Sequence, residues 1–318
     1  MSLKKYFKFV DIKTSILSLY AYALGAAFIF YYLGNWNWQN ALVFFFAEMI
    51  QDNMVTGINN VMDYRHAKTE QTRKQNVMEK ENISMTSAIS VIVIMMIISA
   101  AAGIWLCFRT NWFLFFAGGA LFLIVCCYTA GPFPIDKTPM GEIFCGISQG
   151  MGMPFLFAYV NNNWNTLISL NFKQIANGSF TFSIQGSLTA MIAIILACYP
   201  SMMYNSGVML ANNISDMEND KLDHRYTLPI VFGKKKAFNL YRFMGYTPFI
   251  AIVLAVILRM APILLLLTLI TIPKVRKNVE GFIANPGKGT TFLSSLANYR
   301  MVIGMQAITM FVGKLLNF

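Results

Sequence analysis

Hydrophobic residues run through this chain in long blocks, and the polar residues gather in the segments between them. Most blocks match the roughly 20 apolar residues that a helix needs to cross a bilayer. The pattern predicts nine membrane-spanning helices, of which the eighth is short and bracketed by Pro262 and Pro273. We place these helices at 14–33, 40–61, 85–107, 111–129, 141–161, 186–212, 237–258, 261–273 and 297–317.

The first block follows the basic start MSLKKYFKF and is too long for the core of a signal peptide. No small-x-small cleavage site follows it, so we expect a retained first helix. The polar segment 162–184 predicts a loop on the outer side. Residues 1–318 therefore predict a single transmembrane domain of the all-α class.

Composition supports a membrane protein. Of the 318 residues, 56% are hydrophobic and only 12% are charged, and the mean hydropathy is +0.53. About 25% of the residues of a soluble domain are charged. The chain is therefore predicted to be an integral, multi-pass protein of the lipid bilayer.

The placement of charges orients the helices. With the N-terminus inside, 21 of the 25 Lys and Arg residues fall in inner segments, which is the positive-inside pattern. We therefore expect a cell-membrane protein whose N-terminus and polar inner loops are cytoplasmic. The same cations explain the net charge of +11 without a nucleic-acid partner, and some of them are expected to contact anionic lipid head groups.

Neither the five cysteines nor the two histidines show the spacing of a metal site. We assign the cysteines to packing, and His66 and His224 to solvated loops.

Two stretches share an unusual polar pattern. INNVMDYRHAK at 58–68 and ANNISDMENDK at 211–221 both contain Asn-Asn-x-x-Asp, followed five residues after the Asp by Lys68 or Lys221. Ionisable residues in membrane spans are costly and are functional candidates by default. Each copy ends a span that runs inward, so we expect the two copies to meet at one depth and form one site.

Periodicity aligns the polar residues of each span on one helix face. In the sixth span, Asn212, Asp216 and Asp220 are spaced by four residues. Such stripes line a protein interior or a wet cavity, although interhelical hydrogen bonding explains residues such as Asn53 or Thr56 equally well. The corresponding stripe of the second span consists of Glu48, Asp52, Thr56, Asn59, Asn60 and Asp63.

Carboxylate and amide oxygens are the ligands that Mg²⁺ prefers, and Mg²⁺ usually takes one or two carboxylates together with phosphate oxygens. Both motif loops also carry cations that suit a diphosphate. The cations are Lys68, Arg73 and Lys74 in one loop, and Lys221 and Arg225 in the other. The combination predicts a site for a metal-bridged diphosphate, unless these cations only set the topology.

Three segments resemble the UbiA superfamily of intramembrane aromatic prenyltransferases. NNISDMENDKLDHRYTLPIVFGKKKA resembles its second Asp-rich motif, most closely that of 1,4-dihydroxy-2-naphthoate prenyltransferases, and NNVMDYRHAKTE resembles its first. YTAGPFPIDKTPMGEIFCGISQG at 128–150 is similar to the linker between the fourth and fifth helices of that family. The resemblance implies a UbiA-like bundle with both Asp-rich motifs at the cytoplasmic face.

The chain departs from the family pattern at several positions. Asn60 and Ala67 stand where the first motif usually has aspartates, and Arg225 and Tyr226 replace a usual Lys-Arg pair. The Arg-Pro pair that usually opens the first helix is absent. The changes at Asn60 and Ala67 affect how the first motif would hold its metal. The change at Arg225 and Tyr226 affects one expected contact with the diphosphate.

The resemblance implies an enzyme that transfers a polyprenyl group from polyprenyl diphosphate to 1,4-dihydroxy-2-naphthoate, with loss of CO₂ and diphosphate, giving demethylmenaquinone. The implied cofactor is Mg²⁺, held by Asn59, Asp63, Asn212, Asp216 and Asp220. The implied catalytic residues are Asp63, Asp216, Asp220 and Tyr128, whose ring would face the allylic cation. The implied substrate-binding residues are Asn59, Asn60, Lys68, Arg73, Asn212, Asn213, Lys221, Arg225 and Glu142.

Other interpretations remain open at this point. Within the family, the acceptor could be 4-hydroxybenzoate or haem. Glu142, Gln149 and Tyr204 are candidates for the acceptor pocket, and packing explains Tyr204 equally well. A secondary transporter would instead place carboxylates near the membrane midplane at broken helices, whereas the carboxylates here lie beside basic loops.

Overall fold

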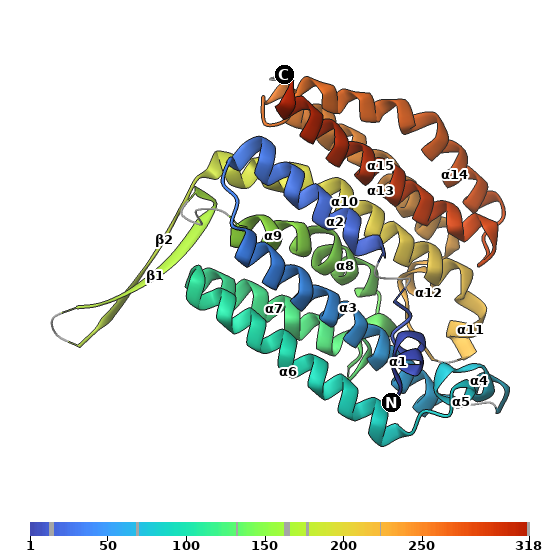
Figure 1. Cartoon of the computed structure of the whole chain (residues 1–318). Helices are drawn as coiled ribbons and strands as arrows, with labels where there is room; N and C mark the ends of the chain where they lie inside the picture. The colour runs from blue at the N-terminus through green and yellow to red at the C-terminus, as the bar shows by residue number, and fades with distance from the viewer. Residues whose placement is uncertain are drawn as a thin grey trace.

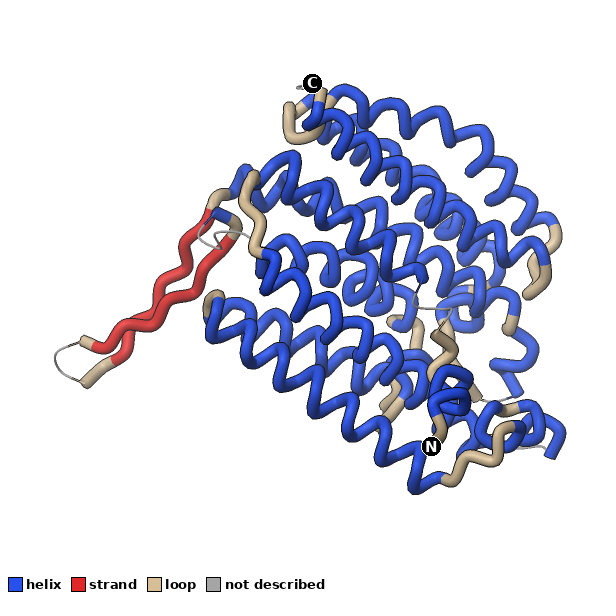
Figure 2. The backbone as a smooth tube through the Cα atoms, in the orientation of Figure 1, coloured by secondary structure: helices blue, strands red, loops and turns tan. Residues whose placement is uncertain are grey.

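Helices form nearly all of the computed structural model, which describes residues 1–12, 16–67, 70–131, 133–161, 166–175, 178–222 and 224–316. The long helices run along one common direction, and a two-stranded hairpin leaves the bundle at one end (Figure 1). Figure 2 shows the same division between the helical bundle and the hairpin.

The N-terminal part of the bundle contains α1 (Leu3–Phe9), α2 (Ile16–Phe28), η1 (Ile29–Leu33), α3 (Trp38–His66), α4 (Glu70–Gln75), α5 (Val77–Lys80), α6 (Met85–Arg109) and α7 (Trp112–Thr129). The middle contains η2 (Ile135–Lys137), α8 (Gly141–Cys145), η3 (Gly146–Gly152), α9 (Met153–Asn161), β1 (Ile168–Gln174) and β2 (Phe180–Gly186). The C-terminal part contains α10 (Leu188–Ser215), α11 (Met217–Leu222), α12 (Leu228–Phe232), α13 (Lys234–Ile257), η5 (Ile263–Thr271), α14 (Ile272–Ala284) and α15 (Thr290–Leu315).

Several long helices begin at residues whose side chains cap them. The side-chain oxygens of Asn37, Ser84, Asn111 and Ser187 accept hydrogen bonds from backbone N–H groups at the starts of α3, α6, α7 and α10. These N–H groups have no partner within the helix, so the caps fix where each helix begins.

Six helices of the described residues are long and apolar enough to cross a membrane, which agrees with the integral membrane protein predicted from the sequence. They are α3, α6, α7, the helix over 141–161, α10 and α13, and Leu17–Leu33 is a shorter apolar helix. The number of nine spans stays a prediction. Pro273 does not end the eighth predicted helix, which continues as α14 to Ala284, because proline is tolerated in a first helical turn.

The hairpin of β1 and β2 lies where the sequence predicted only an outer loop, so the fold is not purely α-helical. Phe172 stands opposite Phe182, and Leu170 stands opposite Ile184. These residues share one face of the ribbon because side chains alternate along a strand. The hairpin projects from the end of the bundle opposite α1, α4, α5 and α11 (Figure 1).

Helix α10 packs against α13, α15 and η3 in the larger of two hydrophobic clusters. The smaller cluster joins α1, α3, α5 and α6 around the fully buried Met54. Gly146 and Gly150 let η3 approach α10 closely, since a Cβ atom on Gly150 would lie 2.5 Å from the Met202 Cα. Small residues four apart commonly allow such close packing between membrane helices.

Candidate active site

The two Asn-Asn-x-x-Asp copies end on the same side of the bundle. The first copy lies in the last turns of α3, and the second covers the end of α10 and the start of α11. Figure 1 places α11 near α1, α4 and α5, away from the hairpin. The second stripe is not one continuous helix, because Asp216 is the C-cap of α10 and Asp220 belongs to α11.

Asp216 forms an ion pair with a residue that the sequence analysis did not assign to the site. The Lys288 Nζ lies 2.5 Å from the Asp216 Oδ2, and the Asp216 side chain is 16% exposed while that of Lys288 is 58% exposed. Lys288 belongs to the loop between α14 and α15. The lysine therefore covers the motif carboxylate from its solvent side.

Asp220 forms a second charged contact, through Arg225, with Asp136. The Arg225 guanidinium lies 3.2 Å from the Asp220 Oδ1 and 3.2 Å from the Asp136 Oδ2. An Arg225 N–H also donates to the Asp136 carbonyl oxygen, and Thr227 donates its hydroxyl to the Asp220 Oδ2. Arg225 thus joins the loop after α11 to the loop between α7 and α8.

The pKa of Asp136 reports the charges that surround it. Burial raises this pKa above its ordinary value, and Arg225 and Lys137 oppose the increase. The negative charges of Asp63 and Asp220 raise it further. Asp136 therefore lies within electrostatic reach of both motif copies. We use the name mouth cluster for Asp63, Asp136, Asp216, Asp220, Arg225 and Lys288.

Burial likewise raises the pKa of Asp220, with Asp216 adding to the increase. Arg225, Thr227 and Lys288 act in the opposite direction. The basic side chains therefore keep the buried carboxyls of the mouth cluster closer to their ionised form than burial alone would allow.

The second asparagine of each copy binds another part of the protein. The Asn60 Nδ2 donates to the Phe9 carbonyl oxygen at 2.7 Å, and this contact ties α3 to α1. The Asn213 Nδ2 donates to the Glu142 Oε1 at 2.8 Å, and both of these side chains are buried. The structure thus directs Asn60, Asn213 and Glu142 toward protein partners rather than toward the mouth cluster.

The first asparagines differ from each other in their contacts. Thr129, at the end of α7, donates its hydroxyl to the Asn59 Oδ1. Asn212 is half-buried and precedes Asp216 by one helical turn. Both amides lie on the motif helices close to the aspartates of the mouth cluster.

The remaining predicted site residues lie around the mouth cluster or outside the described chain. Lys221 pairs with Glu218 at 3.1 Å on the surface of α11. Arg73 of α4 stacks over the Tyr64 ring at 4.6 Å and donates to its hydroxyl. Lys68 falls outside the described residues.

Two aromatic candidates differ in their surroundings. Tyr128, near the end of α7, donates its hydroxyl to the Gly141 carbonyl oxygen at 3.3 Å. Tyr204 is buried between α10 and α13, where its hydroxyl donates to the Gly245 carbonyl oxygen. These surroundings favour packing, the alternative that the sequence left open for Tyr204.

Asp136 and Lys288 carried no recognisable pattern in the sequence. Asp136 is a single acidic residue in a loop rich in Pro and Gly, and Lys288 lies in the segment Asn-Pro-Gly-Lys-Gly. Neither residue is separated from another site residue by the three or four positions that would place both on one helix face. Their place in the mouth cluster depends on how the loops fold back on the motif helices.

The described residues contain no group of three or more His, Cys, Asp or Glu side chains arranged to hold a metal ion. The Asp216 carboxylate instead contacts the Lys288 ammonium group, and the Asp220 carboxylate contacts the Arg225 guanidinium group.

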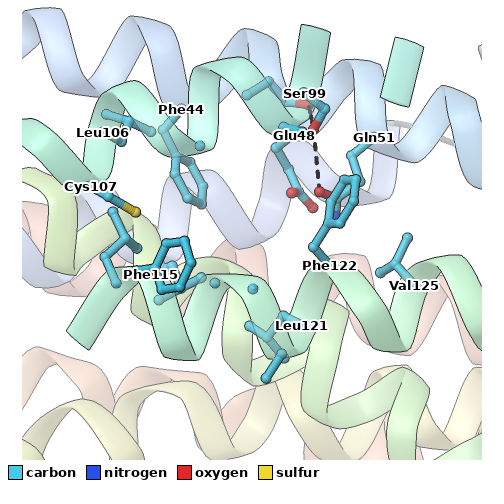
Figure 3. Close-up of a pocket in the computed structure, with 18 of the residues that line it drawn as sticks. Phe44, Glu48, Gln51, Ser99, Leu106, Cys107, Phe115, Leu121, Phe122 and Val125 are labelled. Atoms are coloured by element: carbon cyan, nitrogen blue, oxygen red, sulfur yellow. Dashed lines mark hydrogen bonds between the residues drawn. The ribbon is translucent and has the colours of Figure 1, made fainter. Parts of the chain in front are cut away.

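A cavity of about 550 Å³ lies between α3, α6, α7 and the helix formed by η3 and α9. Its wall is mainly apolar and includes Leu114, and Figure 3 shows Phe44 and Leu106 across the cavity from Phe122 and Val125. Phe116 and Leu123 line the cavity and are 53% and 64% exposed on the bundle surface. A cavity of this size and character suits a mainly apolar small molecule.

The model of the UbiA prenyltransferase family matches residues 18–275 of the chain. The 1,4-dihydroxy-2-naphthoate octaprenyltransferase of Bacillus subtilis (strain 168) is 32% identical over 188 residues, which are 59% of this chain and 52% of that protein. The chain therefore spans about half the length of this curated relative.

Solved structures share the fold at low sequence identity. The structure of a digeranylgeranylglyceryl phosphate synthase is 18% identical, with a TM-score of 0.65 over 98% of each chain. A UbiA homologue from Archaeoglobus fulgidus, bound to DMAPP and Mg²⁺, is 13% identical, with a TM-score of 0.63 over 97% of this chain and 99% of that chain. An apo UbiA homologue from Aeropyrum pernix K1 is 16% identical, with a TM-score of 0.66 over 96% and 98%. Because the family model covers most of the sequence and the bundle matches these structures, the chain belongs to the UbiA prenyltransferase family.

Proposed function

We propose that this enzyme transfers a polyprenyl group from a polyprenyl diphosphate to 1,4-dihydroxy-2-naphthoate, releasing diphosphate and CO₂ and forming demethylmenaquinol, the reduced form of demethylmenaquinone. The observation that carries the proposal is the mouth cluster, in which acidic motifs and basic loops converge. The likeness to the Bacillus subtilis octaprenyltransferase supports the acceptor and the reaction. Family membership argues against the secondary transporter considered from the sequence.

The mouth cluster suits a diphosphate because its cations are held by carboxylates rather than by packing. Lys288 is 58% exposed and belongs to a loop with glycine on both sides of it, so its ammonium group can turn toward a phosphate oxygen. Arg225 can form paired hydrogen bonds with phosphate. Arg73 and Lys221 lie exposed nearby on α4 and α11, where they complete a basic rim. We also propose that Lys68 binds the diphosphate, because it follows the first motif in the sequence.

The donor set of the mouth cluster fits Mg²⁺. Lys288 on Asp216 and Arg225 on Asp220 already show that these carboxylates attract cationic groups. A cage of three protein carboxylates is unnecessary, because Mg²⁺ usually completes its shell with water and phosphate oxygens. When bound, the metal neutralises the charge of the departing diphosphate. The residues proposed to hold it are Asn59, Asp63, Asn212, Asp216 and Asp220.

Departure of the diphosphate leaves an allylic cation that must be stabilised without being captured. We assign this role to the Tyr128 ring, because its hydroxyl is engaged by the Gly141 carbonyl oxygen while the aromatic face can stabilise positive charge. The electron-rich naphthoate ring then attacks the cation through carbon, and CO₂ leaves the ring. The hydrocarbon tail occupies the apolar part of the cavity beside Phe44, Leu106 and Leu114.

The protein is proposed to lie in the cell membrane, with the mouth cluster facing the cytoplasm. The excess of Lys and Arg in the predicted inner segments supports this orientation. A polyprenyl diphosphate could then enter with its charged end in water and its tail in lipid.

A reconstituted assay tests the proposal. The purified protein is given dihydroxynaphthoate, geranylgeranyl diphosphate and Mg²⁺, with and without EDTA, and products are identified by mass spectrometry. We expect a prenylated, decarboxylated 1,4-naphthalenediol, detected as such or as the quinone that air oxidation forms from it, and this product should disappear with EDTA. Parallel reactions with 4-hydroxybenzoate and haem test the other acceptors, and product from one of these alone would overturn the naphthoate assignment.

A further inference from the structure

Glu48 is an unusual residue in the cavity between α3, α6 and α7. Its side chain is 8% exposed, and it forms no hydrogen bond within the described part of the chain. Figure 3 shows its carboxyl group pointing into the cavity, between Phe44 and Phe122. A buried carboxyl without a partner is costly, especially within a membrane-spanning helix, unless a ligand or water satisfies it.

The other polar side chains of this wall already have partners. Ser99 donates its hydroxyl to the Gln51 Oε1 at 3.5 Å (Figure 3). Ser148 donates to the Phe144 carbonyl oxygen at 2.7 Å. The Gln149 Nε2 donates to the Asp52 Oδ1 at 3.2 Å. Glu48 is therefore the carboxyl that the cavity offers to a bound molecule.

The chemistry of the two proposed substrates decides which of them Glu48 can recognise. A prenyl tail is a hydrocarbon and has no group that can donate a hydrogen bond. The aromatic acceptor carries hydroxyl groups and is flat and largely apolar, as the phenylalanine-rich wall requires. We infer that Glu48, Gln51, Ser99 and Gln149 form the binding site for the hydroxyl side of the aromatic acceptor, with the Glu48 carboxyl as its hydrogen-bond acceptor.

The position of this site along α3 suits the reaction. Glu48 precedes Asn59 by eleven residues, which corresponds to roughly 16 Å of helix. A fused aromatic ring bound at Glu48 and a prenyl diphosphate bound at the mouth cluster together cover that separation. Asp52, which accepts a hydrogen bond from Gln149, lies between the two sites and continues the polar path along α3.

Charge sets the orientation of the ring within the site. The Glu48 and Asp52 carboxyls offer no positive charge to the carboxylate of the acceptor, whereas the mouth cluster holds Arg225 and Lys288. The ring is therefore expected to enter with a hydroxyl toward Glu48 and its carboxylate toward the basic groups of Arg225 and Lys288. This site rests on the proposed function, since it assigns the aromatic acceptor to the part of the cavity around Glu48, beside the apolar part proposed for the prenyl tail.

The test compares the binding of two probes that differ by one hydrogen-bond donor. Binding of 1-naphthol and of 1-methoxynaphthalene to the purified protein in detergent is followed by probe fluorescence, without prenyl diphosphate or metal. We expect the wild-type protein to prefer 1-naphthol by about fivefold, the effect of one hydrogen bond. Glu48→Leu should lose this preference, and Glu48→Gln, which keeps an acceptor oxygen, should retain most of it.

Ser148→Ala is the matched control, because Ser148 lines the same wall but its hydroxyl is used by Phe144. It should leave the preference for 1-naphthol unchanged. Binding of geranylgeranyl diphosphate with Mg²⁺, measured by calorimetry, should be the same for Glu48→Leu and wild type. A preference for 1-naphthol that survives Glu48→Leu would overturn the inference. If this variant also bound the diphosphate more tightly, Glu48 would be assigned to the tail instead.

The two proposals fail in different ways. A preserved naphthol preference together with no product in the reconstituted assay would reject the proposed reaction and retain the aromatic site. Product formation with no preference of the wild-type protein for 1-naphthol would retain the reaction and reject the site at Glu48.

Discussion

The two copies of Asn-Asn-x-x-Asp are nearly identical in sequence and differ in what surrounds them. In both copies the second asparagine braces the fold, Asn60 against the backbone of α1 and Asn213 against the buried Glu142. The aspartates differ, since Asp63 is exposed near the end of α3 whereas Asp216 is half-buried under Lys288.

The difference arises from where each copy lies relative to the end of its helix. The first copy is wholly inside α3, so Asp63 remains on a regular helix. The second copy crosses the end of α10, and Asp216 becomes the C-cap from which α11 starts. This break brings Asp220 to Arg225 and, through it, to Asp136. The comparison teaches that the second asparagine of each copy contacts another part of the protein, whereas Asp216 and Asp220 contact the basic side chains of Lys288 and Arg225.

The largest effect is expected for the motif aspartates. Asp63→Asn and Asp216→Asn should each lower turnover by at least about 10²-fold, because each removes a negative charge proposed to hold the metal that would neutralise the departing diphosphate. The melting temperature should change little, since a partly exposed ion pair such as that of Asp216 contributes at most about 1 kcal/mol. Wild-type turnover in either variant would show that its copy is not part of the catalytic site.

Loss of Arg225 should produce the next largest effect. Arg225→Gln leaves the buried carboxyls of Asp136 and Asp220 without their cation, and we expect a loss of about 2 kcal/mol in the free energy of unfolding. This is less than for a fully buried pair because the Arg225 side chain is 23% exposed. Lys221→Gln, at an exposed pair with Glu218, is the control and should cost less than about 1 kcal/mol.

The same variant should change the pH dependence of stability. Burial already raises the pKa values of Asp136 and Asp220 in the folded protein, and losing Arg225 should raise them further. A carboxyl with a raised folded pKa favours folding while it is protonated, and this contribution is lost as the pH rises through that pKa. Arg225→Gln should therefore approach wild-type stability toward pH 4 in denaturant titrations. An equal loss at all pH values would argue against an electrostatic origin.

Replacement of the bracing asparagines tests the structural half of the comparison. Asn213→Ala should cost about 1–3 kcal/mol in the free energy of unfolding, because it removes the side-chain donor of the fully buried Glu142. Asn60→Ala should cost less, about 1 kcal/mol, because Asn60 is only half-buried. Neither should change the affinity for Mg²⁺ in the folded protein. Loss of Mg²⁺ affinity without loss of stability would return these asparagines to the substrate site.

The smallest effect is expected at Lys288. Lys288→Met removes a group that competes for Asp216, so Mn²⁺ alone should bind up to about fivefold more tightly by electron paramagnetic resonance. The same variant should bind prenyl diphosphate less tightly, because one cation of the mouth cluster is lost. Lys274→Met, an exposed residue of α14, is the control. Equal effects of the two variants would mean that Lys288 acts only through the net charge.

Much of the fold could be predicted because membrane spans have a strong local signal. Block length and apolarity located the helices, and capping residues such as Ser84 and Ser187 began them close to the expected positions. The hairpin could not be predicted from 162–184, because its alternating apolar residues, such as Phe180, Phe182 and Ile184, are interrupted by polar ones that also suit a loop. The continuation of α14 through Pro273 depended on packing as well.

The sequence by itself determined that this is a largely helical, integral membrane protein, and it predicted two acidic motifs that meet at one site, because hydropathy and helical periodicity are local properties of the chain. Only the tertiary structure decided that Asn60 and Asn213 face protein partners, and that Asp136 and Lys288 belong to the mouth cluster. It also decided that Glu48 faces a cavity without a partner. Hydrogen bonds and ion pairs between distant segments depend on which loops and helices come within about 3 Å of each other, and sequence spacing along one helix does not carry that information.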